Sequence, residues 1–282
     1  MRSGGIAVTI GHCGKAAGKS VIVIQGKTYP DAPVFSVIVP VHNAAQTLPA
    51  TLNSLRAQSF ENWEAILVDD ASSDGSLAIL QRACIQDPRM RLLHDPAQKR
   101  ARQVAATRNL GLAQARGDFV AFLDADDRWL PEKLAAQLRA FDQGADIVFS
   151  SYRRVDENGL SKGVVRAEAE VTWETALSGN PIGCSTGAYR RTRFAQARMP
   201  VDMLPEDYVF WLSLMREGGV AVGLSQVLAE YRVSPGSRSA NKLASAIGVW
   251  RVLGQQEIGL LKRLRGFSGY MGASVMRRLA SR

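Results

Sequence analysis

Two short segments of the chain concentrate carboxylates. Residues 69–75 read DDASSDG, and residues 124–127 read DADD. If four or five such groups gather at one place, their mutual repulsion is costly unless a cation offsets it. A divalent ion does so with oxygen ligands, and Mg²⁺ typically combines one or two protein carboxylates with substrate phosphates. The two segments therefore predict a site for a metal-bridged diphosphate.

Part of this pattern has a simpler interpretation. Ser72, Ser73 and Asp74 are residue types that commonly cap the start of a helix. Capping explains Asp69 and Asp70 poorly, because both come directly after an apolar run. Residues 124–127 have an alternative as well, a solvated turn ahead of the next helix.

The elements around these segments alternate between strand and helix. Apolar, β-branched runs predict buried strands at residues 35–39, 63–68, 90–93, 119–123 and 147–150. Apolar residues at helical spacing predict helices at residues 45–58, 76–85, 101–115 and 131–141. This order indicates an α/β fold, with a mostly parallel sheet covered by helices on both faces. Ligands of such sheets bind beyond the carboxyl ends of the strands, where both acidic segments lie.

Four segments, in order, resemble the nucleotide-binding half of the family 2 glycosyltransferases, which have the Rossmann-like GT-A fold. They are residues 35–43 (FSVIVPVHN), 66–75 (ILVDDASSDG), 106–111 (ATRNLG) and 117–127 (GDFVAFLDADD). Each is weak alone, but four with fitting spacing are specific. The resemblance covers residues 34–235, more loosely toward the end. It implies transfer of a sugar from a nucleotide diphosphate donor of the UDP-sugar type to an acceptor hydroxyl, with Mn²⁺ or Mg²⁺ as cofactor.

The resemblance also implies which residues bind the base of the donor. Asp70 matches the carboxylate that hydrogen-bonds the base of a uridine-type nucleotide. Pro40 and His42 lie where the family packs residues around that base, and Asn43 belongs to the same donor-binding turn. The family usually has Tyr in place of His42, which leaves the base preference open.

Further along, Asp124 and Asp126 match the DxD pair of the family. By resemblance Asp124 faces the ribose and Asp126 binds the metal ion, with Asp127 as a neighbouring hydrogen-bond acceptor. Arg108 is expected to reach a phosphate or the sugar of the donor. Its alternative is an exposed helix arginine with no part in the site.

Residues 204–212 (LPEDYVFWL) carry the expected catalytic base. Pro205 suits the start of a helix, and acidic residues suit its positive end, so Glu206 and Asp207 have a purely structural alternative. The resemblance assigns them to the Glu-Asp motif of the family, in which Asp207 is the base. A sugar hydroxyl is a poor nucleophile until a carboxylate takes its proton. One base without a covalent nucleophile implies single displacement with inversion at the anomeric carbon.

Bulk properties narrow the setting. Hydrophobic residues make up 46% of the 282 residues and charged residues 22%, an ordinary globular balance. Cys13, Cys84 and Cys184 lie far apart, which disfavours a disulfide framework or a zinc cluster. No apolar run is long enough to span a bilayer, and no secretory signal is recognisable. We therefore expect a cytoplasmic protein.

The charge is concentrated in the last part of the chain. Of the net charge of +9, residues 238–282 carry +8, because nine basic residues there face a single acidic one, Glu257. The near-neutral remainder argues against nucleic acid as a partner. A basic amphipathic helical tail with a tryptophan can lie on an anionic membrane surface or pack on the catalytic domain with a solvated face. A membrane location, peripheral on the inner face, suits a lipid-linked saccharide acceptor in surface-polysaccharide synthesis.

The chain thus divides into three parts. Residues 1–33 are expected to be a loosely ordered extension with a short strand at 21–24, residues 34–237 the GT-A domain, and residues 238–282 the tail. A phosphate loop at residues 14–20 is disfavoured, because Cys13 stands where its first glycine belongs. Three other functions stay open: a nucleotidyltransferase, a non-catalytic membrane-surface protein that retains the fold, and, least favoured, a phosphohydrolase with Asp124 as nucleophile.

Overall fold

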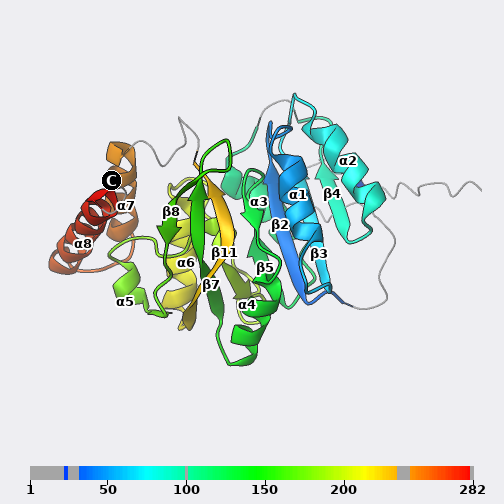
Figure 1. Cartoon of the computed structure of the whole chain (residues 1–282). Coiled ribbons are helices and arrows are strands. Elements are labelled where there is room, and N and C mark those ends of the chain that lie inside the picture. The colour runs from blue at the N-terminus through cyan, green and yellow to red at the C-terminus, as the bar shows by residue number, and fades with distance from the viewer. Residues whose placement is uncertain (1–21, 25–31, 99–100, 234–241, 280–282) are drawn as a thin grey trace, which may run out of the picture.

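The computed structural model describes residues 22–24, 32–98, 101–233 and 242–279. One sheet runs through these residues, with helices on both faces and a pair of helices, α7 and α8, at one end (Figure 1). Nine of its eleven strands follow one another in the order β1-β4-β3-β2-β5-β10-β7-β11-β6, while β8 pairs with β7 and β9 with β11.

The first half of the chain builds the parallel part of the sheet. The order β4-β3-β2-β5 is parallel throughout, and these strands are β2 (Phe35–Val41), β3 (Trp63–Asp69), β4 (Met90–His94) and β5 (Phe119–Phe122). The helices between and after them are α1 (Leu48–Arg56), α2 (Ser76–Gln86), α3 (Val104–Leu112) and α4 (Lys133–Asp142). The predicted alternation of strand and helix is confirmed. The helix expected from residue 45 begins at Leu48 instead, because residues 44–47 form a turn closed by hydrogen bonds to the carbonyl of Ala44.

The second half is more regular than its sequence indicates. It contains β6 (Arg128–Trp129), β7 (Ile147–Val155), β8 (Ser161–Val165), β9 (Glu170–Val171), β10 (Ala188–Arg190) and β11 (Ala221–Arg232). Its helical elements are α5 (Trp173–Ala176), the 3₁₀ turn η1 (Cys184–Thr186) and α6 (Glu206–Arg216). β10 runs antiparallel between β5 and β7 and so joins the two halves into one sheet.

Two hydrophobic clusters lie on opposite faces of the sheet. Because side chains alternate along a strand, Ile38 and Ile66 face one cluster, while Val39 and Leu67 face the other. The first cluster also contains most apolar residues of α6 and three residues of α7. Gly117, just before β5, is packed so closely that an added Cβ would lie 2.6 Å from the backbone nitrogen of Ser36. This close approach requires glycine.

At its two ends, the chain can be compared with the predicted extension and the predicted tail. The short strand expected at residues 21–24 is present as β1 (Ile22–Ile24), antiparallel to β4. The rest of the 1–33 extension, including the phosphate-loop candidate at residues 14–20, lies outside the described residues. The tail is helical as predicted, but it forms two helices, α7 (Lys242–Gly254) and α8 (Leu260–Leu279). Among the residues the structure describes, no helix is long and apolar enough to cross a membrane.

Candidate active site

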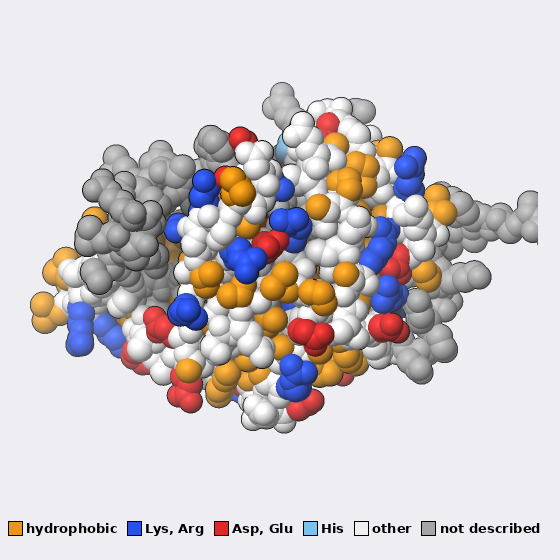
Figure 2. All heavy atoms as spheres, in the orientation of Figure 1, with side chains coloured by type: hydrophobic (Ala, Val, Ile, Leu, Met, Phe, Trp, Pro, Cys, Tyr) orange, Lys and Arg blue, Asp and Glu red, His pale blue; other side chains and the backbone are white. Residues whose placement is uncertain are grey.

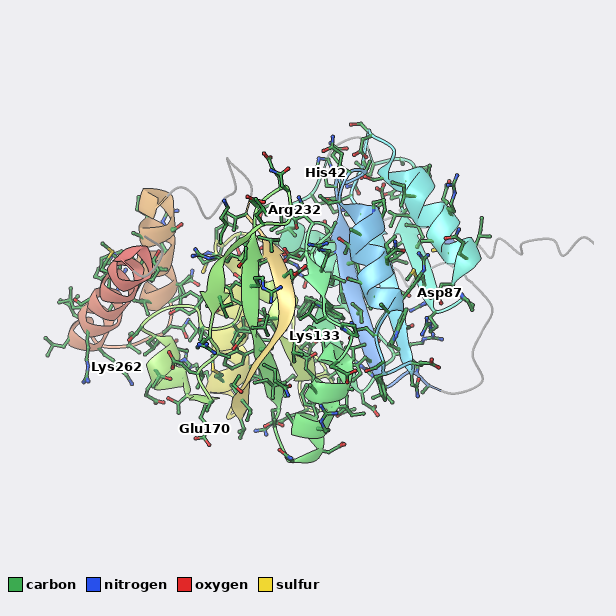
Figure 3. All side chains as sticks on the ribbon, in the orientation of Figure 1. His42, Asp87, Lys133, Glu170, Arg232 and Lys262 are labelled. Carbon is green, nitrogen blue, oxygen red and sulfur yellow. The ribbon has the colours of Figure 1, made fainter. Side chains whose placement is uncertain are left out.

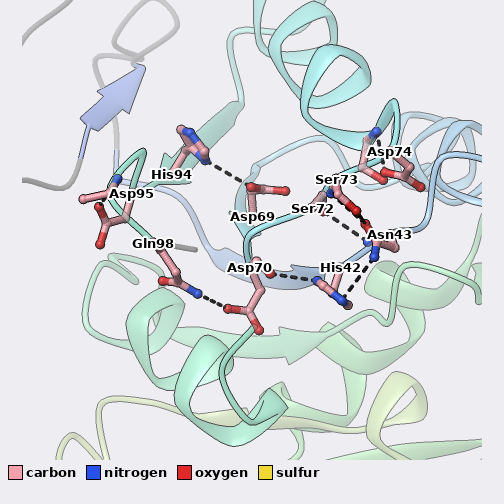
Figure 4. Close-up of polar contacts among 12 residues, drawn as sticks. His42, Asn43, Asp69, Asp70, Ser72, Ser73, Asp74, His94, Asp95 and Gln98 are labelled. Carbon is pink, nitrogen blue, oxygen red and sulfur yellow. Dashed lines mark hydrogen bonds and ion pairs between the residues drawn. The ribbon is translucent and has the colours of Figure 1, made fainter. Parts of the chain in front are cut away.

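The turns after β2 and β3 adjoin at one edge of the sheet. The two strands end in register, Val41 opposite Asp69, and the Asp70 N–H donates to the Val41 carbonyl at 2.8 Å. Side-chain hydrogen bonds then fasten one turn to the other: Asn43 accepts from the Ser73 N–H at 2.8 Å, and the Asn43 N–H donates to Ser72 Oγ at 3.1 Å (Figure 4). Asn43 has a φ of +49°, a conformation that asparagine tolerates well. Its structural part is to hold the two turns together, while its contact with a donor stays a prediction.

The two adjacent aspartates of the β3 turn have different partners. Asp69, at the end of the buried strand, pairs with Nδ1 of His94 at 3.0 Å. The Asp70 carboxylate accepts from the Gln98 side-chain amide at 2.6 Å (Figure 4). It also accepts from the Arg102 N–H at 2.9 Å and 3.0 Å. Asp69 is thus paired with a histidine of the neighbouring strand, while Asp70 bonds residues that follow that strand.

The predicted base-binding residues lie together. Nδ1 of His42 is 2.8 Å from the Asp70 carbonyl oxygen, and its ring is exposed, so a face is available for stacking. Pro40, one position before the end of β2, pairs in register with Val68 and is buried. Figure 3 shows His42 at the same edge of the sheet as Arg232, which ends β11. The ends of β2 and β11 therefore lie at one edge of the sheet.

Arg108 joins two carboxylates that are far apart in sequence. From α3, its guanidinium donates to Asp124 Oδ1 at 2.6 Å and to Glu206 Oε1 at 2.9 Å. Its side chain is 2% exposed, so the alternative of a solvent-exposed helix arginine is wrong. Burial lowers the pKa of Arg108, but the charges of Asp124 and Glu206 counteract it and leave the pKa above its usual range. The ion pair ties the DxD turn to the start of α6.

Both carboxylate oxygens of Asp207 accept hydrogen bonds from the protein. Its Oδ2 accepts from the Asn180 side-chain amide at 3.1 Å, and its Oδ1 accepts from the Tyr208 N–H at 2.8 Å. Burial, followed by the neighbouring charge of Glu206, raises the pKa of Asp207 to about 6. A carboxylate with a pKa close to the working pH is ionised and still basic enough to take a proton.

The turn after β5 separates its three aspartates. Asp126 is exposed at the tip, whereas Asp127 is buried and accepts from the Arg232 N–H at 2.9 Å. Burial first, and then the charges of Asp124 and Asp126, raise the pKa of Asp127 well above its usual range. The alternative of a merely solvated turn fails for Asp124 and Asp127, because both have protein partners.

A divalent ion fits this turn only together with a substrate. Within the described ranges, no three His, Cys, Asp or Glu side chains are grouped closely enough to hold a metal ion. An exposed carboxylate such as that of Asp126 matches the way Mg²⁺ is held by one or two carboxylates plus substrate phosphates. The donor set is therefore oxygen-based and incomplete without a diphosphate.

Several residues of the site escape recognition in the sequence. Trp129 Nε1 and Lys133 Nζ donate to the carbonyls of Ser185 and Thr186, each at 2.8 Å, and so hold η1 beneath Asp124. Ser185 Oγ in turn accepts from the Asp124 N–H at 3.1 Å. Burial lowers the pKa of Lys133 to about 7. A lysine in an amphipathic helix reads as solvated, so no sequence signal indicates this contact. For Arg102 and Asn180 a signal exists: a basic run follows β4, and an Asn-Pro turn precedes η1.

Solved structures share the fold. A fragment of S. aureus TarS in complex with UDP-GlcNAc superposes with a TM-score of 0.66 at 22% identity, covering 84% of this chain and 71% of that one. A mannosyltransferase from Pyrobaculum calidifontis, in complex with GDP-Man and Mn²⁺, gives a TM-score of 0.63 at 20% identity, with 88% and 76% covered. At these identities the likeness confirms the GT-A fold.

Sequence relatives are closer. A putative teichuronic acid biosynthesis glycosyltransferase, TuaG, of Bacillus subtilis is 35% identical over 88% of this chain and 98% of its own length. A UDP-Glc:alpha-D-GlcNAc-diphosphoundecaprenol beta-1,3-glucosyltransferase, WfgD, of Escherichia coli is 32% identical over 79% and 87%. Residues 36–196 match the family described as Glycosyl transferase family 2. The chain therefore belongs to the family 2 glycosyltransferases.

Proposed function

We propose that this glycosyltransferase transfers a sugar from a UDP-sugar to an acceptor hydroxyl by single displacement with inversion, with Asp207 as the general base. The observation that carries the proposal is the bridge made by Arg108. Its 2.6 Å and 2.9 Å bonds connect the DxD residue Asp124 to Glu206, the neighbour of Asp207, which supports one shared site. The donor end and the base end of the reaction are thus held at a fixed spacing.

Each end of the site has its own task. We assign the nucleotide base to His42 and Asp70, and the diphosphate to the side of Asp126. A divalent ion held there would stabilise the negative charge that develops on the departing diphosphate. Asp207 takes the proton of the acceptor hydroxyl as its oxygen bonds to the anomeric carbon. The bond from that carbon to the diphosphate oxygen breaks, and the nucleoside diphosphate leaves with the electron pair. Glu206 is bonded to Arg108, so its part is to position the base.

The donor and the acceptor are proposed from the relatives. WfgD is named for a UDP-Glc donor and a diphosphoundecaprenol-linked acceptor, and the TarS fragment was solved with UDP-GlcNAc. The Mn²⁺ in the mannosyltransferase complex supports a divalent ion as cofactor. A lipid-linked saccharide of a surface polysaccharide is therefore the acceptor class that we propose. Family membership leaves the nucleotidyltransferase and phosphohydrolase alternatives without support.

A lipid-linked acceptor requires access to a membrane, and α8 offers a suitable face. Its side chains Leu260, Leu261 and Leu264 are 65%, 84% and 46% exposed, next to the basic Lys262 and Arg265. Figure 2 shows hydrophobic and basic side chains beside one another at this end of the molecule. Exposed leucines flanked by cations suit an anionic bilayer surface. We propose that α8 contacts the inner face of the membrane, while α7 packs on the catalytic domain.

Two experiments test these proposals. A panel of nucleotide sugars with and without Mn²⁺ is scored by thermal shift and by transfer to a lipid-linked saccharide. We expect a UDP-sugar to stabilise the protein with Mn²⁺ and to be turned over, and Asp207→Asn to abolish turnover while donor binding stays within about twofold. Turnover by Asp207→Asn at the wild-type rate would reject the assigned base. Donor hydrolysis and transfer both absent from the wild type would favour a non-catalytic protein.

The membrane contact is tested by liposome flotation. Full-length protein and the variant with Leu260, Leu261 and Leu264 changed to Ser are compared on vesicles with and without anionic lipid. We expect the variant to lose binding to anionic vesicles. The matched control is Ile85→Ser, which changes an exposed apolar residue on a different helix, α2. Equal binding by all three proteins would show that α8 is not the membrane contact.

A further inference from the structure

We infer that the helix pair α7–α8 holds the catalytic base in place, acting through the two chain segments that meet at Asp207. This inference rests on the proposed role of Asp207. The first segment, residues 204–207, leads into α6 and carries Asp207 itself. The second, residues 176–180, ends α5 and carries Asn180, whose amide bonds Asp207. The tail contacts both segments through closely packed glycines.

α7 packs against the first segment. A Cβ at Gly248 would lie 2.8 Å from the Leu204 carbonyl oxygen and 3.2 Å from Pro205 Cδ, so only glycine permits the observed approach. Val252 and Leu253 of the same helix are fully buried in the cluster that contains Tyr208 and Phe210 of α6. The backbone that leads directly to Glu206 and Asp207 is thus supported by α7.

α8 packs against the second segment. A Cβ at Gly266 would lie 2.9 Å from the Leu177 carbonyl oxygen, and one at Gly269 would lie 2.7 Å from Ser178 Oγ. A Cβ at Gly179 would lie 3.5 Å from Cδ2 of Tyr270, its nearest neighbour. Just after α7, Gln256 accepts from Trp173 Nε1 of α5 at 3.3 Å. The turn that leads to Asn180 therefore lies directly against the tail.

The two segments are also bonded to each other at the base. Asn180 donates to Asp207 Oδ2 at 3.1 Å, and the Tyr208 hydroxyl donates to the Ala176 carbonyl at 2.7 Å. A shift of either helix would move one segment relative to the other and turn the Asp207 carboxylate away from its position. Asp70 and Asp126 lie on other turns, and only Asp124 is linked to the first segment, through Arg108 and Glu206, so we expect UDP binding to change far less than kcat.

Three alanine variants test the inference. Gly248→Ala and Gly266→Ala each add one methyl group against a backbone carbonyl, whereas Gly272→Ala adds the same group on α8 with nothing within 4 Å. We expect the first two to lower kcat about tenfold or more while the Kd for UDP with Mn²⁺ stays within about twofold. Gly272→Ala should leave both unchanged. Circular dichroism and Tm report whether each variant is folded.

Folded Gly248→Ala and Gly266→Ala variants with wild-type kcat would overturn the inference, since the contact would then be only structural. If both fail to fold, Gly269→Ala is the milder probe, because the atoms it meets belong to the exposed Ser178 side chain. We expect it to lower kcat severalfold, and an unchanged kcat again overturns the inference. Failure of the proposed function gives a different result: Asp207→Asn would then keep its turnover whatever the glycine variants do.

Discussion

The side-chain amide of Asn180 donates a hydrogen bond to Oδ2 of Asp207 at 3.1 Å. The other carboxylate oxygen accepts from the Tyr208 N–H, so Asp207 is held from both sides. A donor to the ionised carboxylate favours its charged form. Asn180 thus counteracts the burial and the Glu206 charge that raise the pKa of Asp207.

Asn180→Ala removes this donor, and we expect the pKa of Asp207 to rise further. The acid limb of the kcat–pH profile should move to higher pH, with a loss of about tenfold at pH 6.5 and a smaller loss at pH 8.5. Asn158→Ala, in the turn between β7 and β8, is the matched control. An equal loss at both pH values would show that Asn180 positions Asp207 without affecting its ionisation.

The wild-type enzyme should itself lose activity in mild acid. The pKa of Asp207 is raised to about 6, and only the ionised carboxylate accepts the proton of the acceptor. Below that pH the ionised fraction, and with it kcat, should fall about tenfold per pH unit. Initial rates between pH 4.5 and 8 measure this, with donor binding followed in parallel. A flat profile down to pH 4.5 would contradict Asp207 as base.

Asp207→Asn should be inactive and yet more stable. A carboxyl group whose pKa is raised in the folded state binds its proton more tightly there than in the unfolded chain. The folded state therefore loses stability as the pH rises from 3.8, the ordinary pKa of aspartate, to about 6, the raised pKa of Asp207. Above that pH the loss of stability stays constant. The asparagine avoids this loss. The Tm difference between variant and wild type should grow between pH 4 and 6 and then stay level, whereas a pH-independent difference would contradict the ionisation argument.

The sequence predicts the parallel half of the fold well, because its strands are buried on both faces and read as mostly apolar runs. β2, β3, β4 and β5 all coincide with such runs. β8 and β9 do not, because β8 is largely exposed and β9 has only two residues. Their pairing with β7 and β11 comes from tertiary contacts that local sequence does not encode.

The site shows a similar division. The sequence motifs and the order of strands and helices predict the turns that carry Asp70, Asp124 and Asp207. The buried state of Arg108 does not, because a helix arginine reads as exposed until its partners are known. Glu206 lies 98 residues further along the chain, so no local pattern indicates that the two side chains meet. Long-range ion pairs of this kind become visible only in the structure.

Arg108→Met should strongly destabilise the protein. Removing one partner from a buried ion pair costs about 3–5 kcal/mol, because the remaining charge stays buried without compensation. Here Glu206, at 5% exposure, loses the guanidinium that donates to it at 2.9 Å. Arg153→Met is the control, since Arg153 pairs with Glu230 at the surface and should cost less than about 1 kcal/mol. Urea denaturation measures the free energy of unfolding of both variants. Adding Glu206→Gln to Arg108→Met should restore part of the lost stability.

The metal requirement is expected to depend on Asp126 and not on Asp70. Asp126→Ala removes the exposed carboxylate at the DxD turn, so Mn²⁺ should no longer increase UDP affinity, which in the wild type we expect to rise about tenfold or more with the ion. Asp70→Ala removes a base contact instead, so it should weaken UDP to a similar extent with and without Mn²⁺. Calorimetric titration of UDP, with Mn²⁺ or with chelator, separates the two. Asp142→Ala, at the exposed end of α4, is the control. If Asp126→Ala retained the full effect of Mn²⁺ on UDP binding, the ion would have to be held elsewhere and the assignment of Asp126 would be wrong.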